Sequence, residues 1–276
     1  MADARTLREF ERLVDIVARL RAPDGCPWDR EQTLDSLKRY VLEETYEVLE
    51  AIDRADHQGL CEEIGDHLFE GVLLAQVASD EGHFVLADAL AAVADKLVRR
   101  HPHVFARDAG HAPLGTSDEV VTRWDEIKAA ERAAKGAGNR RTSVLDGIPS
   151  ALPALAQADQ IGRRAAATGF DWETTTGVVD KMQEEVDELR DALEERNADA
   201  SRAEDELGDV LFTIANLSRK LGIEPETALR KANHKFIARF TQMEQRLAAD
   251  GRAIKTLAPA ELEDAWQETK RLMEKS

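Results

Sequence analysis

Apolar side chains recur every three or four positions through most of the chain, in long tracts rich in Ala, Leu, Glu and Arg. This spacing places the apolar residues on one face of an α-helix, and these residue types are strong helix formers. Aromatic residues make up only 5% of the 276 residues and charged residues make up 33%, a composition that favours helices over sheets. The pattern predicts an all-α chain.

The predicted helices contain a repeated phrase. The sequence EIGDHLF at residues 63–69 returns as ELGDVLF at residues 206–212, each time with glycine inside an otherwise helical pattern. Glycine in a helix interior is less favourable than alanine by about 1 kcal/mol, so the matched glycines suggest a reason in packing or in chemistry. Other landmarks recur in the same order at a similar offset: Trp28 and Trp172, Glu44 and Glu185, Lys96 and Lys235, Arg100 and Arg239, Trp124 and Trp266, and Lys128 and Lys270.

Landmarks that recur in one order at one offset indicate two copies of a single helical unit. The stretch between the copies is rich in Gly, Ser, Asn and Pro, which break the helical period. We expect a first domain over residues 1–135, a linker over 136–148 and a second domain over 149–276. We expect four helices in each copy. The first precedes the tryptophan turn, the second contains the triple glutamate, the third contains the glycine phrase and the fourth contains the Lys/Arg pair.

The first copy has two further helix signals. Residues 116–132 predict an additional helix with Thr116 or Ser117 as its N-cap, and the last helix of the second copy corresponds to it. In RRHPHVF, residues 99–105, Pro102 is expected to end a helix whose last turn carries basic side chains, which a helix C-terminus favours.

The formal net charge of −17 limits the choice of partners. Such a charge repels a nucleic-acid backbone and an anionic membrane surface, so we expect neither as a partner. A small phosphorylated ligand that arrives with divalent cations is compatible with it. The two cysteines, Cys26 and Cys61, do not suggest a disulfide framework, and no apolar run resembles a signal peptide or a membrane span. We therefore expect a cytoplasmic protein.

Two acidic pairs of the second copy are candidates for a metal site. Glu185 and Glu188 are three residues apart, as are Glu206 and Asp209, so each pair lies on one helix face. A turn between the two helices would bring the pairs together, and four converging carboxylates raise one another's pKa unless a cation compensates them. Oxygen ligands suit Mg²⁺, with Mn²⁺ as a substitute. Gly208 is expected to relieve crowding of helices, metal and phosphate there. Either pair alone could equally be solvated surface.

The second copy also carries candidates for nucleotide binding: Lys231, Asn233, Lys235, Arg239, Trp266 and Lys270. Lys231, Lys235 and Arg239 are four residues apart on one stripe, which suits a polyphosphate, and Asn233 could donate a hydrogen bond. The tryptophan could stack on a base and the lysine one turn later could touch a phosphate. Surface ion pairs and core packing would explain the same residues.

Other helical proteins with acidic metal sites fit less well. A ferritin-like di-metal oxidase needs Glu-x-x-His on two helices, and both phrases here end in Asp. A prenyl-diphosphate synthase would carry Asp-Asp-x-x-Asp, which this sequence lacks. A helical protein that binds a nucleotide or a partner protein without turnover stays open, because binding and hydrolysis need the same ligands.

The phrases CPWD, LEETYE, RRHPHVF and KANHKFIARF, together with the duplicated Glu-Glu-x-x-Glu and Glu-x-x-Asp patterns, resemble the MazG-type nucleoside triphosphate pyrophosphohydrolases in their two-domain bacterial form. The resemblance covers nearly the whole chain. It implies an all-α homodimer that converts NTPs and dNTPs to monophosphates and pyrophosphate with Mg²⁺, as in house-cleaning of the nucleotide pool.

The resemblance also implies roles for single residues. It matches the metal ligands to Glu185, Glu188, Glu206 and Asp209. It matches nucleotide-contacting positions to Lys181, Lys235, Arg239, Trp266 and Lys270. Glu184 corresponds to an extra acid beside the ligands, and Glu184 or Glu185 would orient or deprotonate the attacking water. Arg202 stands where the family often has Lys, which keeps the charge and changes the geometry of its donors.

The first copy keeps the acidic pattern, with candidate metal ligands at Glu44, Glu47, Glu63 and Asp66. However, Tyr40 stands where the second copy has Lys181, and Ala94 stands where it has Asn233. The loss of a charged contact weakens binding by roughly 1–3 kcal/mol. We therefore expect the second domain to carry most of the activity.

Overall fold

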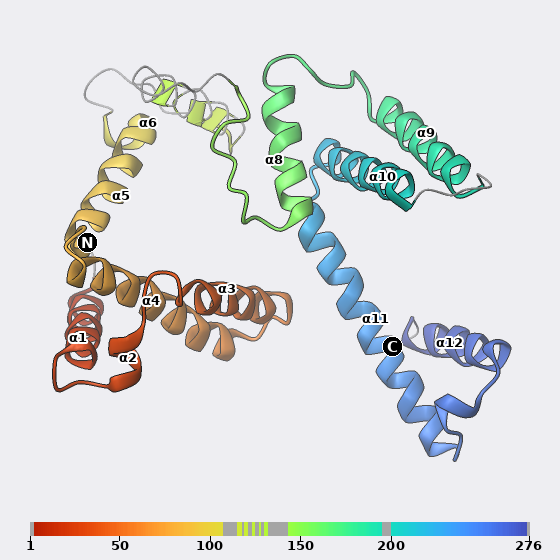
Figure 1. Ribbon diagram of the computed structural model, residues 1–276, viewed down its shortest axis with the longest axis horizontal. Coiled ribbons are helices and arrows are strands. Elements are labelled where there is room, and N and C mark those ends of the chain that lie inside the picture. Colours follow the sequence, from red (N-terminus) through yellow and green to blue (C-terminus); the bar gives the residue numbers. More distant parts are fainter. Residues whose placement is uncertain are drawn as a thin grey trace. The chain divides into compact units, whose positions relative to one another are not determined.

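A computed structural model gives the arrangement of the helices (Figure 1). It describes residues 3–106, 115–117, 119–120, 123–124, 127, 130–131, 143–194 and 200–274. The described residues form helices and no β-strand, which confirms the predicted all-α class. No helix in this described part is both long and apolar enough to cross a membrane.

The chain divides into two compact units, residues 1–139 and 140–276. The helices of the first unit are α1 (Ala4–Arg21), α2 (Pro27–Glu31), α3 (Lys38–Asp53), α4 (His57–Asp80), α5 (Leu86–Arg100) and α6 (Pro102–Phe105). Those of the second unit are α8 (Ala154–Ala166), α9 (Thr175–Glu194), α10 (Ala200–Lys220), α11 (Pro225–Ala249) and α12 (Pro259–Met273), with the 3₁₀ turn η2 (Ile254–Thr256). The expected linker lies partly outside the described residues, so the domain bounds stay predictions.

In the first unit, α4 is the central helix and packs against α1, α3 and α5. A turn of three residues joins α3 to α4, and Asp56 caps α4 by accepting hydrogen bonds from the backbone N–H groups of Gln58 and Gly59. The fully buried core is small and apolar and consists of Val17, Leu37, Val72, Leu73 and Val77. The amphipathic faces of α1 and α4 meet in this core, which fixes α4 and the acidic residues that it carries.

In the second unit, α10 packs against α9 and α8, and α12 folds back onto α11 (Figure 1). Gly162 of α8 allows a close approach to α10, because a β-carbon there would lie 2.3 Å from Oδ1 of the buried Asn216. Asp171 precedes α9 and forms ion pairs with Arg219 and Lys220 at the end of α10. These contacts fix the start of α9 against the end of α10.

The two helix signals of the first copy have different outcomes. Several of residues 116–132 lie outside the described residues. Among those described, the hydroxyl of Thr116 accepts from the N–H of Glu119 and the Glu119 carboxylate accepts from the N–H of Thr116. This reciprocal pair is a capping box, so Thr116 is the N-cap. Helix α5 ends at Arg100, two residues before Pro102, with Arg99 and Arg100 in its last turn, as the sequence predicted.

Candidate metal and nucleotide site

The second unit brings three of its predicted metal ligands together. Carboxylate oxygens of Glu185 and Glu188 on α9 and of Glu206 on α10 all lie within 4.8 Å of one another. The three-residue spacing on α9 and the packing of α9 on α10 account for this convergence. The fourth predicted ligand, Asp209, is exposed on α10 and does not belong to this group.

Lys181 holds the acidic side chains of α9 in place. Its Nζ lies 2.7 Å from Oε1 of Glu184 and 2.9 Å from Oε1 of Glu185. Glu185 is 5% exposed, whereas Glu184 is exposed. The hydrogen bonds to Glu184 and then Glu185 raise the pKa of Lys181 above its ordinary value. The lysine is therefore a fixed positive charge beside the carboxylate group.

The electrostatics of this group fit a bound cation. Burial raises the pKa of Glu188, and the nearby charges of Glu185 and Glu206 raise it further, while Lys181 opposes the shift. Like charges at this spacing favour protonation unless another cation compensates them. A set of donors that consists only of carboxylate oxygens suits Mg²⁺ or Mn²⁺.

Arg202 lies in the first turns of α10, with Nε 3.7 Å from Oε1 of Glu206. It thus borders the group of carboxylates, at the position predicted to contact the nucleotide. The four-residue spacing that places Arg202 beside Glu206 is visible in the sequence.

Three basic residues of α11, Lys231, Lys235 and Arg239, form a row along the helix. Lys231, Asn233 and Lys235 are exposed, and Arg239 is half-buried with Nη2 3.8 Å from Oε1 of Glu274. Their four-residue spacing places the three cations on one face of the helix. No contact within the described residues joins this row to the carboxylate group, so its role at the site stays a prediction.

Trp266 and Lys270 lie one turn apart on α12. The Trp266 ring packs on Phe236 of α11, with ring centroids 5.1 Å apart, and Phe236 stacks on Phe240. Trp266 and Lys270 are both partly buried. Trp266 therefore has a packing role in the fold, and stacking of its indole on a base stays a prediction.

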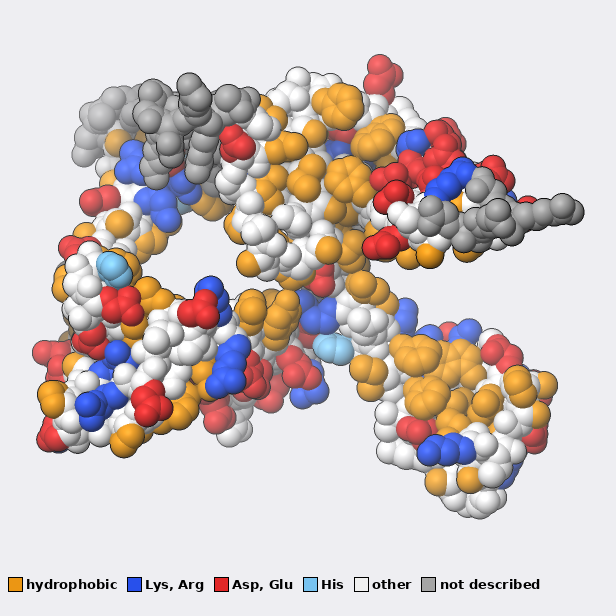
Figure 2. All heavy atoms as spheres, viewed as in Figure 1, with side chains coloured by type: hydrophobic (Ala, Val, Ile, Leu, Met, Phe, Trp, Pro, Cys, Tyr) orange, Lys and Arg blue, Asp and Glu red, His pale blue; other side chains and the backbone are white. Residues whose placement is uncertain are grey.

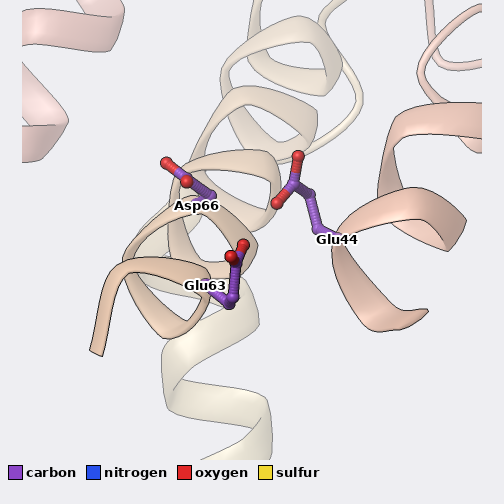
Figure 3. A group of neighbouring side chains, drawn as sticks. All are labelled: Glu44, Glu63 and Asp66. Atoms are coloured by element: carbon purple, nitrogen blue, oxygen red, sulfur yellow. The ribbon is translucent and has the colours of Figure 1, made fainter. Parts of the chain in front are cut away.

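The first unit contains an equivalent carboxylate group. Glu44 of α3 faces Glu63 and Asp66 of α4, and their oxygens lie within 4.8 Å of one another (Figure 3). Glu47 lies outside this group of three, but its charge helps to raise the pKa of Glu63 after the effect of burial. Tyr40, which replaces the lysine of the second unit, packs edge-on against Trp28 with centroids 5.6 Å apart.

The surroundings of the two glycines differ from the expectation, and one buried glutamate was not predicted. A β-carbon built at Gly65 or Gly208 would meet no atom within 4 Å in the described structure. The expected crowding by neighbouring helices at Gly208 is therefore wrong, because α10 leaves open space beside that glycine, while the close approach of a metal ion and a phosphate there stays a prediction. Sequence reasoning also missed Glu70, which is 5% exposed on α4 and lies one turn after Asp66; its i+4 spacing was a visible signal.

An open pocket of about 320 Å³ lies between α11 and α12. Its two arginines are already neutralised, because Arg246 pairs with Glu268 and Arg252 pairs with Glu261, both at 2.9 Å. None of the residues predicted to bind the nucleotide lines this pocket. The pocket is therefore not the candidate site.

Comparison with known proteins gives a consistent result. The family of the MazG nucleotide pyrophosphohydrolase domain matches residues 32–105 and again residues 173–243. The chain is 46% identical to the nucleoside triphosphate pyrophosphohydrolase of Escherichia coli K12 over 266 residues, 96% of this chain and 98% of that protein.

Two further relatives agree. The chain is 41% identical over 261 residues to the nucleoside triphosphate pyrophosphohydrolase/pyrophosphatase MazG of Thermotoga maritima, 95% of either chain. It is 38% identical over 163 residues to the nucleoside triphosphate pyrophosphohydrolase of Mycolicibacterium smegmatis, 58% of this chain and 48% of the relative. Each of the two domain matches contains one of the two carboxylate groups. The chain therefore belongs to the MazG nucleotide pyrophosphohydrolase domain family, and it carries that domain twice.

Proposed function

We propose that this protein hydrolyses nucleoside triphosphates, both NTPs and dNTPs, to the monophosphate and pyrophosphate, and that Mg²⁺ or Mn²⁺ assists the reaction. The observation that supports this proposal best is the convergence of Glu185, Glu188 and Glu206 beside Lys181. Relatives at 46% and 41% identity over nearly the full length bear the name of this activity. Such a reaction fits nucleotide-pool house-cleaning.

The carboxylates of the second unit are the proposed metal ligands. Glu185, Glu188 and Glu206 converge. Asp209 is exposed, and a change of its side-chain rotamer would bring its carboxylate to the group. When bound, the divalent ion supplies Lewis-acid polarisation of a phosphoryl oxygen and neutralises negative charge. Lys181 stays protonated beside them and can donate to a phosphate oxygen in place of Glu184.

The remaining residues would bind the nucleotide. The candidates are Lys181, Arg202, Lys231, Asn233, Lys235, Arg239, Trp266 and Lys270. Protonated amines and guanidinium groups bind the polyphosphate and stabilise the charge that develops on the leaving pyrophosphate. In the proposed step a water oxygen bonds to the α-phosphorus, the bond from that phosphorus to the bridging oxygen breaks, and an Oε of Glu184 or Glu185 accepts the water proton.

The second unit is the proposed catalytic unit. In the second unit, Lys181 forms an ion pair with Glu185 of the carboxylate group. In the first unit, Tyr40 occupies the equivalent position and packs on Trp28. Without that cation, the first unit offers one phosphate contact fewer. The first unit therefore keeps candidate ligands for a metal and has a weakened site for a nucleotide.

We further propose that the protein is a homodimer. Large apolar side chains stay exposed along α10 and α11, including Leu207 at 49%, Leu211 at 46%, Phe236 at 56% and Ile237 at 60%. Figure 2 shows hydrophobic side chains gathered over α11 and α12. Exposed apolar surfaces of this kind are typical of protein interfaces. Sedimentation equilibrium of the wild type and of Ile237→Asp tests this, and a monomeric wild type would contradict it.

Two free cysteines and nucleoside triphosphate substrates support a cytoplasmic setting for the proposed reaction. The net charge of −17 supports a small anion with its cation as the ligand, in preference to a nucleic acid or a membrane surface.

The test of the proposed function is product analysis. ATP, dGTP and dCTP are incubated with the protein in Mg²⁺ buffer, and the products are separated by anion exchange or observed by ³¹P NMR. The variants are Glu206→Gln and its counterpart in the first unit, Glu63→Gln. We expect monophosphate and pyrophosphate from the wild type, and a loss on the order of 100-fold or more in kcat/KM for Glu206→Gln, much larger than the loss for Glu63→Gln.

Other outcomes have definite meanings. Release of orthophosphate would overturn attack at the α-phosphorus. A larger loss in Glu63→Gln than in Glu206→Gln would reverse the roles of the two units. Intact triphosphates after long incubation with a protein that still binds them would indicate a nucleotide sensor.

A further inference from the structure

Two arginines at the end of α5 hold a single carboxylate in the first unit. Nε of Arg99 donates to Oε1 of Glu131 at 2.8 Å, and Nε and Nη2 of Arg100 donate to Oε2 at 3.1 and 2.6 Å. The side chains of Arg100 and Glu131 are each 19% exposed. Guanidinium groups bind oxyanions through several charge-assisted hydrogen bonds of this kind. The arginine pair Arg99 and Arg100 therefore has the geometry of an anion site, and Glu131 occupies it.

The charges of this contact are only partly balanced. The hydrogen bonds from Arg100 and then from Arg99 lower the pKa of Glu131 from 4.5 to about 2, so the carboxylate is ionised at neutral pH. One negative charge then faces two guanidinium charges. A phosphate group has up to two negative charges and three acceptor oxygens, so it would compensate the arginine pair more fully than the carboxylate does.

The second unit lacks this closed contact. Arg100 corresponds to Arg239 at an offset of 139, and at the same offset Ala238 stands where the first unit has Arg99. Nη2 of Arg239 lies 3.8 Å from Oε1 of Glu274, whose side chain is 64% exposed. The arginine of the second unit is therefore loosely held by its glutamate, whereas Arg100 is held by two short hydrogen bonds.

Aromatic rings continue from the arginine pair. His101 directly follows Arg100, and the centroid of its ring lies 5.7 Å from that of His103 and 5.9 Å from that of Trp124. Such rings can stack on a nucleobase. A ligand of the arginine pair could therefore be a phosphate chain alone or a phosphate chain that carries a nucleoside.

We propose that Arg99 and Arg100 form a binding site for a di- or triphosphate group in the first unit, and that Glu131 occupies this site as an internal anion which the ligand must displace. The contact closes the first unit to phosphates for a reason that is separate from the lysine it lacks at Tyr40. The inference rests on the proposed function for the phosphate chemistry of the ligand, and it does not require hydrolysis.

The first test is calorimetric titration of the full-length protein with pyrophosphate, and separately with ATP, in EDTA. The chelator removes divalent ions, so no phosphate binds through a metal and metal-dependent hydrolysis stops. The wild type is compared with Glu131→Gln, which keeps the shape of the side chain and removes its charge. Asp95→Asn is the matched control, because it removes the same charge from an exposed position of α5.

We expect Glu131→Gln to bind pyrophosphate about 10- to 100-fold more tightly than the wild type, and the control to differ from the wild type by less than about twofold. The double variant of Glu131→Gln with Arg100→Gln should lose this gain. A gain that survives in the double variant would arise elsewhere in the chain and would overturn the proposal.

Thermal unfolding separates an anion site from a purely structural ion pair. In EDTA, Glu131→Gln should melt below the wild type, because two arginines lose their counter-ion. Pyrophosphate should raise the Tm of the variant more than that of the wild type, since a ligand stabilises the fold that binds it more tightly. An ion pair with a structural role alone would lower Tm without this recovery. Glu131→Met, which introduces the residue found at position 273 of the second unit, replaces Glu131→Gln should that variant not fold.

Each outcome decides the proposal. Equal pyrophosphate affinity in the wild type and in both Glu131 variants overturns it. With the gain present, tighter binding of ATP than of pyrophosphate assigns a nucleotide as the ligand, and equal binding assigns the phosphate chain alone. Hydrolysis of ATP by the wild type is measured in parallel in Mg²⁺ buffer. A gain without hydrolysis would refute the proposed function and leave this inference standing, and hydrolysis without a gain would refute only the inference.

Discussion

Replacement of Asp171 by Asn should destabilise the second unit. The Asp171 carboxylate accepts hydrogen bonds from Nη1 of Arg219 at 3.2 Å and from Nη2 at 2.5 Å, and it lies 2.8 Å from Nζ of Lys220. The Arg219 side chain is only 9% exposed and that of Lys220 is 17% exposed. Removal of the carboxylate would leave two poorly solvated cations without their counter-ion, at the loop that leads into the site helix α9.

The magnitude follows from the pKa of the carboxyl group. Hydrogen bonds from Arg219, and then from Lys220 against the effect of burial, lower the pKa of Asp171 from 3.8 to about 2. A shift of almost two units corresponds to about 2.5 kcal/mol of preference for the ionised form in the folded state. Since the Asp171 side chain is 24% exposed, solvent screening reduces this value, and we expect a loss of about 1–2 kcal/mol at neutral pH.

The assay is urea unfolding of the wild type and of Asp171→Asn from about pH 6 down to about pH 2. A group whose folded pKa lies below its unfolded pKa stabilises fully above the unfolded value and loses that contribution as the pH falls toward the folded value. The free-energy difference between the two proteins should therefore be constant above about pH 5 and shrink between about pH 4 and about pH 2.

The matched control is Asp187→Asn. Asp187 pairs with Arg190 at 2.6 Å on α9, and both side chains are more than half exposed, so the same substitution should cost less than about 0.5 kcal/mol. If Asp171→Asn is as neutral as the control, or if its effect persists undiminished at the lowest pH, then the ion pairs do not stabilise the loop as argued.

Three further predictions follow from single contacts. Gly162→Ala should lower the stability by about 1–3 kcal/mol in thermal unfolding, because the new methyl group would lie 2.3 Å from Oδ1 of Asn216; an unchanged Tm would show that α8 and α10 can separate freely. Gly208→Ala meets no neighbouring atom and should raise the stability by up to about 1 kcal/mol while it slows ATP hydrolysis, so normal turnover would mean that no substrate approaches this glycine. Lys181→Met should raise the KM for ATP by about 10-fold or more, whereas Lys181→Arg should retain part of the affinity; equal KM values would remove the lysine from the nucleotide site.

The class of fold, the duplication and most of the carboxylate group could be predicted from the order of the residues alone. Helical spacing is a local property. Glu185 and Glu188 therefore share one face of their helix, whichever way that helix packs in the fold. The same applies to Thr116 and Glu119, whose capping box forms within one turn. The similar phrases at residues 63–69 and 206–212 indicated that the chain contains two copies of one unit. The two family matches confirm this duplication.

Which of these side chains are buried, and which partners they have, depends on the packing of the helices. It places Glu185 in the interior with Lys181 beside it and leaves Asp209 outside the group of three. It leaves open space beside Gly208, and it buries Glu70 without a partner for one oxygen. Burial and charge compensation depend on how α3 packs on α4 and how α9 packs on α10. Those contacts join residues far apart in the chain, which the period of a single helix does not specify.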